Sequence, residues 1–470
     1  MYKKTGLLII SVVLLALSCE RQKTILAPAN NISVIQDKEL RKAFAISLGK
    51  DEADITLNDL QTLTQLWNLR GRVQSLHGIE YCTKLTIISL PFGNIKDLSP
   101  LAYLQNLSVV QLSMNGISDI SPLATMTQLT DLNLSGNGIT DIGPLKNLEN
   151  LTHLSLVNNP IKDASVLADL PNLESIQMGH NEITAFPEIS NLQKLKNLTL
   201  SANQISQIPR HAIPPQVEYL DLISNQITDL GGLLDATNLT SLCLSNNLID
   251  DLSGIELRDQ LTDLYIDNNQ ISDLTPLSGL INLRHLSLNN NEISDITPLS
   301  QLLNLMTVRL ADNPIQDLSP LSGLTNLTYV NLDNTRFTDL TPLANLTLYS
   351  LVISNNHIAD LSELKDMVNL QSLDISNNEI SDISPLSQLI NIYILYMNDN
   401  KIVDLTPLAQ FQHLSELHLE NNEINDLAAL VDNPYIQNYL FLKLANNPLS
   451  STAINEQIPA LRERGVNVEY

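Results

Sequence analysis

The sequence predicts an α/β solenoid, in which one short strand and one short turn are repeated along the chain and stacked. Three observations predict this fold. Asparagine recurs at a step of 22 residues over ten positions, from Asn115 to Asn313. The residues before each of these asparagines alternate between apolar and polar, which is the pattern of a strand with one buried face. Aromatic residues make up only 4% of the chain, so leucine and isoleucine must supply the core.

The repeat continues beyond those ten positions. Gly93 and Thr335 occupy the same register on either side, a one-residue deletion near Leu348 resets it, and a worn repeat starts at Leu63. A fixed period of roughly 20 to 50 residues is typical of repeat folds, and 22 falls in the range of leucine-rich repeats. We expect about 17 repeats of 22 residues. The asparagines that form the predicted ladder are Asn115, Asn137, Asn159, Asn181, Asn203, Asn225, Asn247, Asn269, Asn291, Asn313, Asn356, Asn378, Asn400, Asn422 and Asn447.

One repeat shows the expected shape. In residues 129–150, "LTDLNLSGNGITDIGPLKNLEN", the side chains of Leu129, Leu132 and Leu134 point inward and the polar residues between them point outward. Stacked repeats place these strands in one parallel sheet, with neighbouring strands ~4.8 Å apart. We therefore expect a leucine-rich-repeat horseshoe, with the parallel sheet on its concave face and short turns on its convex face.

The asparagine column has a structural explanation. After each strand the chain turns inside the stack and leaves main-chain N–H and C=O groups buried without partners in the sheet. An asparagine amide carries both donors and an acceptor, so a column of amides can satisfy these groups repeat after repeat. Each buried polar group left unpaired costs about 1–3 kcal/mol.

An aspartate column follows the asparagine column. Aspartate stands four residues after the ladder position in fourteen repeats, usually within "DLxPL" or "DIxPL". A carboxylate there can cap the short turn that follows, and proline pre-sets the φ angle of that turn. The exceptions are Ala185, Gln207 and Ser451.

The two ends of the repeat array predict caps. Residues 35–80 are expected to form a helical N-terminal cap and a degenerate first repeat, with Thr56 and Asp59 starting a helix. Residues 81–449 hold the repeats. Residues 450–470 are expected to form a helix, stopped at Gly465, and a last strand, "VNVEY", that covers the edge of the sheet.

The first residues predict export. Residues 1–18 contain two lysines, an uncharged stretch of 13 residues and a small residue before Cys19. This is the pattern of a signal peptide, and the ending "LALSC" resembles a bacterial lipoprotein signal, in which Cys19 becomes lipidated. An ordinary secretory signal with an incidental cysteine is the alternative. Residues 19–34 would form a tether. We expect lipid anchoring in a bacterial cell envelope, at the outer membrane or cell surface.

The repeat motif "NxIxDIxPL" and the helical segment before it resemble the internalin family of bacterial surface proteins, across about residues 35 to 470. The resemblance implies a leucine-rich-repeat fold that binds other proteins on its concave face. It also identifies the segment "DKELRKAFAISLGKDEADITLNDLQTL" with the small helical cap that precedes the repeats in this family.

Large side chains on the predicted concave face gather in two groups. Elsewhere this face is mostly Ser, Thr and Asn, and its basic residues are Arg309 and Lys443. Tyrosine and arginine are frequent anchors of protein interfaces. The alternative is that scattered tyrosines on a long sheet carry no function. The predicted protein-binding residues are Tyr219, Asp221, Asp263, Tyr265, Asp267, His285, Arg309 and Tyr329, and a second, weaker group comprises Tyr396, Glu416, His418 and Phe441.

Several function classes are disfavoured. The net charge of −25 repels phosphate backbones, so nucleic acid is not an expected partner. Asp263, His285 and Ser287 resemble a catalytic trio, and we expect an ion pair between the first two. An open sheet, however, offers neither a pocket nor an oxyanion hole. We therefore expect that the protein is not an enzyme. The histidines share no ligand spacing, so we expect no metal site, and we expect no cofactor.

Two further features are open to two interpretations. Cys243 is expected to face outward beside Tyr265, either as a small filler, which we favour, or as a reactive thiol. The segment "IPRHAIPPQ", with Arg210 and His211, predicts either a local bend or a second, basic contact site on the convex side.

The leading hypothesis is a lipid-anchored envelope protein, monomeric, whose concave face binds a protein with a neutral or basic surface in adhesion or surface recognition. The face carries more acidic than basic residues, which favours such a partner. Glycan or peptidoglycan binding and a passive envelope scaffold are the alternatives.

Overall fold

The structure, a computed structural model, divides into two compact units, Met1–Ile139 and Thr140–Tyr470. The predicted signal peptide, Cys19 and nearly all of the predicted tether lie outside the described residues. No helix within the described part of the chain is long and apolar enough to cross a bilayer. The described residues are 32, 35–68, 72–256, 258–437 and 439–470.

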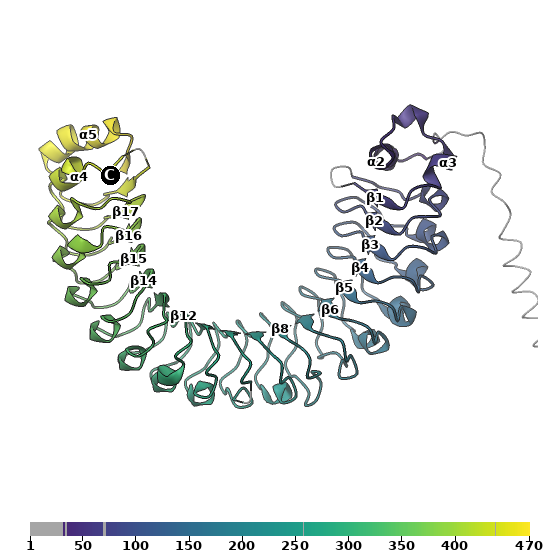
Figure 1. The fold of residues 1–470 in the computed structure, drawn as a ribbon, viewed down its shortest axis with the longest axis horizontal. Coiled ribbons are helices and arrows are strands. Elements are labelled where there is room, and N and C mark those ends of the chain that lie inside the picture. Colours follow the sequence, from purple (N-terminus) through teal and green to yellow (C-terminus); the bar gives the residue numbers. More distant parts are fainter. Residues whose placement is uncertain (1–31, 33–34, 69–71, 257, 438) are drawn as a thin grey trace, which may run out of the picture. The chain divides into compact units, whose positions relative to one another are not determined.

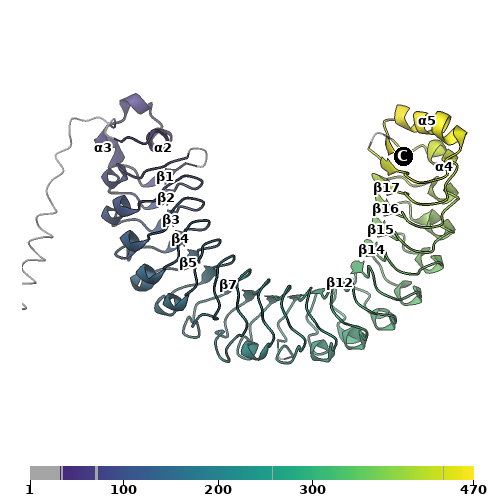
Figure 2. The ribbon, with the colours of Figure 1, turned by 180° about the vertical axis from the view of Figure 1, so that it is seen from behind.

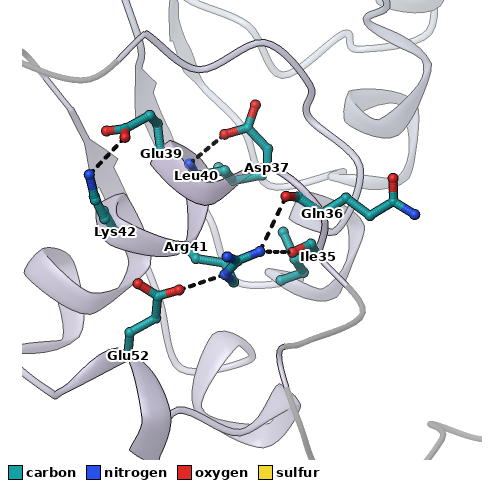
Figure 3. Close-up of polar contacts among 8 residues, drawn as sticks. All are labelled: Ile35, Gln36, Asp37, Glu39, Leu40, Arg41, Lys42 and Glu52. Atoms are coloured by element: carbon teal, nitrogen blue, oxygen red, sulfur yellow. Dashed lines mark hydrogen bonds and ion pairs between the residues drawn. The ribbon is translucent and has the colours of Figure 1, made fainter.

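Helix α2 (Lys38–Leu48) lies at the start of the first unit. Asp37 caps it, because its Oδ1 accepts a hydrogen bond from the N–H of Leu40 at 2.9 Å. Figure 3 shows Arg41 reaching back from this helix to two main-chain carbonyl oxygens and to Glu52, whose Oε1 lies 2.6 Å from the Arg41 Nε. These contacts tie the helix to the segments on either side of it.

Helix α3 (Leu57–Leu60) begins at the predicted residue pair. The side chain of Thr56 accepts from the N–H of Asp59, and the carboxylate of Asp59 accepts from the N–H of Thr56. This reciprocal capping box and the helix α2 confirm the expected helical start of the fold. Lys50 Nζ lies 2.7 Å from Asp59 Oδ1, and this bond, together with those from Thr56, lowers the pKa of Asp59 to about 2.

The strands of the first unit pair in parallel with a step of one repeat. Leu66 is opposite Ile88, and Ile88 is opposite Val110. A one-repeat step brings equivalent side chains together, so the buried leucines and isoleucines stack in columns. The strands are β1 (Gln65–Trp67), β2 (Ile87–Ser89), β3 (Val109–Gln111) and β4 (Asp131–Asn133).

The strands of the second unit follow the same rule. Tyr329 is opposite Ser350, and Glu416 is opposite Phe441. The one-residue deletion near Leu348 and an insertion of three residues before Phe441 are therefore both absorbed outside the strands. These strands are β5 (His153–Ser155), β6 (Ser175–Gln177), β7 (Asn197–Thr199), β8 (Tyr219–Asp221), β9 (Ser241–Cys243), β10 (Asp263–Tyr265), β11 (His285–Ser287), β12 (Thr307–Arg309), β13 (Tyr329–Asn331), β14 (Ser350–Val352), β15 (Ser372–Asp374), β16 (Ile394–Tyr396), β17 (Glu416–His418), β18 (Phe441–Lys443) and β19 (Asn467–Glu469).

Short 3₁₀ turns return the chain from strand to strand. In the second unit the strands lie on the inner side of the bend of the stack and these turns on the outer side, in the views from both directions (Figures 1 and 2). The described residues between β6 and β8, where Ala185 and Gln207 replace the aspartate, contain no 3₁₀ turn. The turns are 52–54, 79–81, 99–103, 121–123, 143–147, 165–169, 231–233, 275–277, 297–301, 319–321, 341–343, 362–364, 384–388 and 406–408.

The core is a set of stacked aliphatic columns. The middle residue of each strand points into it: Leu264 is 0% exposed and Leu286 is 1% exposed. The outer turns contribute the remaining leucines, such as Leu277 and Leu299. The predicted α/β solenoid with a parallel sheet is confirmed, and its strand side in the second unit is hereafter the strand face.

The C-terminal end of the second unit is helical and then extended. A π-helical segment (Ala453–Gln457) runs into helix α5 (Ile458–Glu463), and Gly465 follows with a φ of +84°. Arg464 donates from its guanidinium to main-chain carbonyl oxygens of residues 431–436, next to helix α4 (Ala428–Asp432). Strand β19 then pairs in parallel with β18 at the edge of the sheet.

Candidate functional site

The asparagine column satisfies main-chain groups. In the repeat of Asn247, Nδ2 donates to the carbonyl oxygens of Leu222 and Leu244 at 3.0 and 2.8 Å, and Oδ1 accepts from the N–H of Ile227 at 2.9 Å. All fifteen asparagines of the predicted ladder donate from Nδ2 to at least one main-chain carbonyl oxygen. Their amides are therefore directed into the fold and are not available to a partner.

The column has one substitution inside it, at Thr335. Its hydroxyl donates to the carbonyl oxygen of Leu332 at 2.9 Å and lies 3.1 Å from Asn356 Oδ1. In other repeats the side chain at this position also accepts a hydrogen bond from a main-chain N–H of the preceding repeat. The hydroxyl of Thr335 does not, and the N–H of Ile315 bonds to the carbonyl oxygen of Asn313 instead. At this repeat the ladder therefore lacks one of its side-chain acceptors.

A second polar column, which the sequence reasoning missed, stands directly before the first. The residue before each ladder position has a φ between 49° and 67°, in the left-handed region. Asparagine and aspartate tolerate this conformation better than other side chains. The signal was present in the sequence, because nine of these positions are asparagine and two are aspartate: Asn158, Asn246, Asn268, Asn290, Asn334, Asn355, Asn377, Asn421, Asn446, Asp312 and Asp399.

This second column lines a groove along one flank of the second unit. Its amides bond from repeat to repeat, for example Asn290 Nδ2 to Asn268 Oδ1 at 2.7 Å. Two overlapping depressions of about 730 and 520 Å³ share Asn334, Asn355 and His357 in their lining. The groove therefore presents mainly polar groups: amides, carboxylates, an imidazole and the guanidinium of Arg336.

Each side chain of the aspartate column accepts a hydrogen bond from the main chain at the start of the turn that follows it. In fourteen repeats Oδ1 accepts from the N–H two residues later. In all of them except the repeat of Asp251, that N–H belongs to the first residue of a 3₁₀ turn or of helix α4. Hydrogen bonds to the charged form lower the pKa of nine of these carboxyl groups.

The first predicted group lies together on the strand face. Tyr265, His285, Arg309 and Tyr329 come from the successive strands β10 to β13, and each is half-buried. The guanidinium carbon of Arg309 lies 5.0 Å from the centre of the Tyr329 ring, a cation–π contact. Tyr219 lies two strands before Tyr265, on β8.

The expected ion pair between Asp263 and His285 is wrong. The two residues are opposite each other in the register, but within the described chain no ion pair joins them. Thr262 Oγ1 instead donates to Asp263 Oδ2 at 2.6 Å. Ser287 is also occupied elsewhere, because its hydroxyl lies 2.5 Å from Asp267 Oδ1. The three side chains thus do not form a relay.

Two predicted acidic anchors are occupied inside the protein. Asp267 accepts from the hydroxyl of Ser287 and from the N–H of Asn289, and it also bonds to Ser245. Asp221 is 8% exposed and accepts from the N–H of Ile223 at 3.0 Å. The alternation of the strand places both on the strand face, but both carboxylates accept hydrogen bonds from the chain itself, and Asp221 is buried while Asp267 is half-buried.

Cys243 has the predicted orientation but is not exposed. It pairs in register with Tyr265 and is only 7% exposed. Burial and the nearby carboxylate of Asp221 raise the pKa of its thiol to about 11. Burial also raises the pKa of the neighbouring Tyr219 to about 12. The thiol therefore stays protonated near neutral pH and packs as a small apolar side chain.

The expected basic patch on the convex side is surrounded by acid. His211 Nδ1 lies 2.5 Å from Asp235 Oδ2. Arg210 lines a depression of about 520 Å³ together with Asp229, Asp250 and other carboxylates. The segment therefore offers no net positive surface to a partner.

The comparisons with known proteins decide the family. A sequence model described as "Leucine Rich repeats (2 copies)" matches residues 105–147, 127–169, 149–191, 215–257, 259–301, 304–345 and 348–388, together more than half of the chain. The chain belongs to the leucine-rich-repeat family. A sequence search of curated proteins found no match.

Solved structures of other leucine-rich-repeat proteins share the fold. An internalin, InlF, from Listeria monocytogenes is 28% identical over 76% of this chain and 94% of its own, with a TM-score of 0.58. The protein LIC12759 from Leptospira interrogans is 23% identical over 88% and 97%, with a TM-score of 0.64. The plant receptor RGFR1, solved with the peptide hormone RGF2, is 17% identical over 88% and 80%, with a TM-score of 0.65.

Leucine-rich-repeat proteins commonly bind other proteins and are typically recognition proteins rather than enzymes. In this leucine-rich-repeat chain, the described residues contain no group of three or more His, Cys, Asp or Glu side chains arranged to hold a metal ion. The strand face and the polar groove are two surfaces of the described chain that present side chains suited to recognition.

Proposed function

We propose that this chain is a lipid-anchored protein of a bacterial cell envelope and that the strand face of its leucine-rich repeats binds another protein. The common use of this repeat in protein recognition supports the proposal. The observation that carries it is the set of half-buried side chains Tyr265, His285, Arg309 and Tyr329 on four successive strands. The lipoprotein motif ending at Cys19 supports the anchor.

These side chains have the properties of interface anchors. Tyrosine and arginine supply large contact areas, and such anchors contribute about 2 kcal/mol or more each at the centre of an interface. The contact between Arg309 and Tyr329 limits the rotamers of both residues before a partner arrives. Asp263, half-buried beside them, adds negative charge, which favours a partner with a neutral or basic surface.

The decisive experiment removes the anchors without disturbing the core. We expect the variant Tyr265→Ser/Arg309→Ser/Tyr329→Ser to lose the protein that the wild-type chain captures in proximity labelling on intact cells and in pull-down. The matched control, Arg284→Ser/Tyr349→Ser/Tyr393→Ser, changes the same residue types at exposed positions outside the strand face. Equal capture by both triple variants, with unchanged melting temperatures, would contradict the assignment of this site.

The anchor has its own test. Replacing Cys19 by alanine is expected to abolish incorporation of labelled fatty acid and to release the protein from the membrane fraction. A variant of the residue directly before the cysteine, Ser18→Ala, keeps a small side chain there and should be labelled normally. Fatty-acid incorporation into Cys19→Ala would exclude this cysteine as the lipidated residue.

A second candidate function rests on the flank groove. Its amides, the carboxylate of Glu292 and the guanidinium of Arg336 are groups that can bond to sugar hydroxyls, which favours a glycan or peptidoglycan ligand. Sedimentation with purified peptidoglycan tests it. Binding that the variant Arg336→Ala/His357→Ala loses, and that the triple variant of the strand face keeps, would favour the groove over the protein-binding face.

A further inference from the structure

Three aromatic rings stand side by side near the C-terminal end of the strand face. Tyr396 on β16 is opposite His418 on β17, and their rings stack with centres 4.4 Å apart and planes 27° apart. Phe441 on β18 meets His418 edge-on, with ring centres 6.1 Å apart. Such geometries stabilise aromatic pairs beyond the area they bury. The rings therefore form a fixed platform across three strands.

Carboxylates border this platform. Glu416 Oε1 lies 3.0 Å from His418 Nε2, although the two atoms are not aligned as a hydrogen bond. Glu420 Oε2 is buried and has no hydrogen-bond partner among the described residues. Burial, and then a hydrogen bond to Glu416, raise the pKa of Tyr396 to about 12. Buried polar atoms without partners are uncommon in native proteins, so they indicate a place where a donor is needed.

One basic side chain of the protein, Lys443, already lies between a ring and a carboxylate of this platform. Lys443 Nζ lies 5.4 Å from the centre of the Phe441 ring and 3.9 Å from Glu420 Oε1. The ammonium is thus held by a ring and a carboxylate together, which is the environment that a basic side chain prefers. The same strand region adds the carboxylates of Asp374 and Glu469, so negative charge exceeds positive charge there.

We infer that this platform, the Tyr396–Phe441 cluster of Tyr396, Glu416, His418, Glu420, Phe441 and Lys443, is a docking site for an arginine of an extended segment of a partner protein. A guanidinium is planar, stacks on aromatic rings and can donate to two carboxylate oxygens at once. The inference rests on the proposed function in that both use the strand face for a protein, but it places a separate contact on β16–β18 and names its chemistry.

The cluster favours a cation over a sugar. A sugar is uncharged, whereas here the rings lie beside the carboxylates of Glu416 and Glu420, and the Phe441 ring already has a cation, Lys443, against it. The carboxylate oxygen Glu420 Oε2, which has no hydrogen-bond partner among the described residues, is an acceptor that matches the donors of a guanidinium. Displacing Lys443 from Glu420 would open the position for the incoming side chain.

The test uses the chain from residue 20 and three capped probes: acetyl-Gly-Arg-Gly-Arg-Gly-amide, the same peptide with lysine, and the same peptide with glutamate. Calorimetry at about 20 mM salt keeps charge interactions measurable. We expect saturable binding of the arginine peptide, weaker binding of the lysine peptide and none of the glutamate peptide. The variant Glu416→Gln/Glu420→Gln should weaken arginine-peptide binding about tenfold or more.

Two further variants separate docking from folding. Lys443→Gln should strengthen binding about threefold because it removes the competing cation, a gain that a purely structural role does not produce. The control Glu188→Gln/Glu423→Gln removes the same charge at exposed positions and should bind as the wild type does. Melting temperatures within about 2 °C of one another establish that all variants are folded.

The outcomes distinguish this inference from the proposed function. Tyr265→Ser/Arg309→Ser/Tyr329→Ser should keep full binding of the arginine peptide, since it leaves β16–β18 unchanged. The inference is overturned if Glu416→Gln/Glu420→Gln and the control Glu188→Gln/Glu423→Gln bind the arginine peptide equally well. It is also overturned if the glutamate peptide binds as well as the arginine peptide, or if a glycan binds the cluster and the arginine peptide does not. Peptide binding that survives while cell-surface capture fails would overturn the proposed function alone.

Discussion

Asn247 Nδ2 lies 3.0 Å from the carbonyl oxygen of Leu222, a residue 25 positions earlier in the preceding repeat. The same amide accepts from Ile227 of that repeat. One side chain therefore joins two repeats through donor and acceptor at once, and it is 6% exposed. In an array where each repeat contacts only its neighbours, the stability depends on the interfaces between adjacent repeats, and this asparagine stabilises one of them.

The variant Asn247→Ala is expected to lower the free energy of unfolding by about 2–4 kcal/mol, because it leaves buried carbonyl and N–H groups unpaired. Urea denaturation measures the loss. Hydrogen exchange of the Ile227 amide should speed up, since its acceptor is removed. Unchanged exchange at Ile227 would show that the amide column does not hold the repeats together.

The opposite change restores the missing side-chain acceptor of the ladder. Thr335→Asn should raise the free energy of unfolding by about 0.5–1.5 kcal/mol, because an amide Oδ1 can accept the N–H of Ile315, as asparagine does in neighbouring repeats. The side chain is 4% exposed and asparagine is larger than threonine. A decrease in stability would therefore indicate that packing, rather than hydrogen bonding, selected threonine here.

Asp59 predicts a pH dependence of stability in the N-terminal cap. Its folded pKa of about 2 lies below the ordinary value near 4, so its contribution is complete above about pH 4 and is lost as the pH falls through about 2. Asp59→Asn should thus destabilise the protein at pH 7 and change little at pH 2. Urea midpoints at both values measure the difference.

Lys50→Ala isolates the cause of that low pKa. The hydrogen bond from Lys50 is the largest contribution, so its loss should raise the pKa of Asp59 toward the ordinary value. Carboxyl chemical shifts followed through an acid titration report this directly. A titration of Asp59 that is the same with and without Lys50 would mean that the capping box alone depresses its pKa.

The repeat itself determined most of what could be predicted. A constant period forces a constant register, so a parallel pairing such as that of Leu66 with Ile88 followed from the repeat. The helix start at Thr56 followed from a different signal, the capping pair of Thr56 and Asp59. The position of a side chain on the strand face also followed from alternation. Alternation does not say which neighbour a side chain meets, however, and it could not show that Asp267 bonds to Ser287 and Asn289.

The same limit applies to the cation–aromatic contact between Arg309 and Tyr329. That Arg309 and Tyr329 are on adjacent strands is a matter of counting, but their stacking depends on rotamers and on what surrounds them. Cys243 is a second example. Its register is set by the repeat, whereas its burial results from the large rings on the neighbouring strands, Tyr219 and Tyr265.

Arg258 is a buried charge in a leucine position. It is 0% exposed, and it stands 22 residues before Leu280, which is also 0% exposed. Its Nη2 donates to the carbonyl oxygen of Leu234 at 3.0 Å, while Nε and Nη1 have no partner among the described residues. Burial lowers the pKa of this guanidinium. Removing such a charge in favour of an apolar side chain is often stabilising.

Arg258→Leu is therefore expected to raise the free energy of unfolding by about 1–4 kcal/mol in urea denaturation. The reverse exchange, Leu280→Arg, provides the control and should destabilise the protein, because it buries a new unpaired charge. If Arg258→Leu lowered stability instead, the hydrogen bond from Arg258 to the carbonyl oxygen of Leu234 would outweigh the cost of burying the charge.

The two cysteines of the repeats should both be inert in the folded protein. Burial raises the pKa of the Cys243 thiol to about 11 and also raises that of Cys82, so little thiolate is present near neutral pH. In the chain from residue 20, a disulfide reagent at pH 8 should react with neither residue until urea is added. Rapid reaction of Cys243 in the native state would mean that its cover on the strand face opens readily.

Asp263 and Asp267 lie on one strand face, four residues apart, and should fail in different ways when removed. Asp267→Ala takes away the acceptor of Ser287 and of the Asn289 N–H, so it should lower the melting temperature as well as any binding. Asp263→Ala removes a half-buried carboxylate that bonds only to the adjacent Thr262 hydroxyl among the hydrogen bonds described, so it should weaken partner capture at unchanged melting temperature. Calorimetric melting beside pull-down separates the two effects. A common loss of stability would place Asp263 with the structural residues, and the acidic contribution to binding would then have to come from elsewhere on the face.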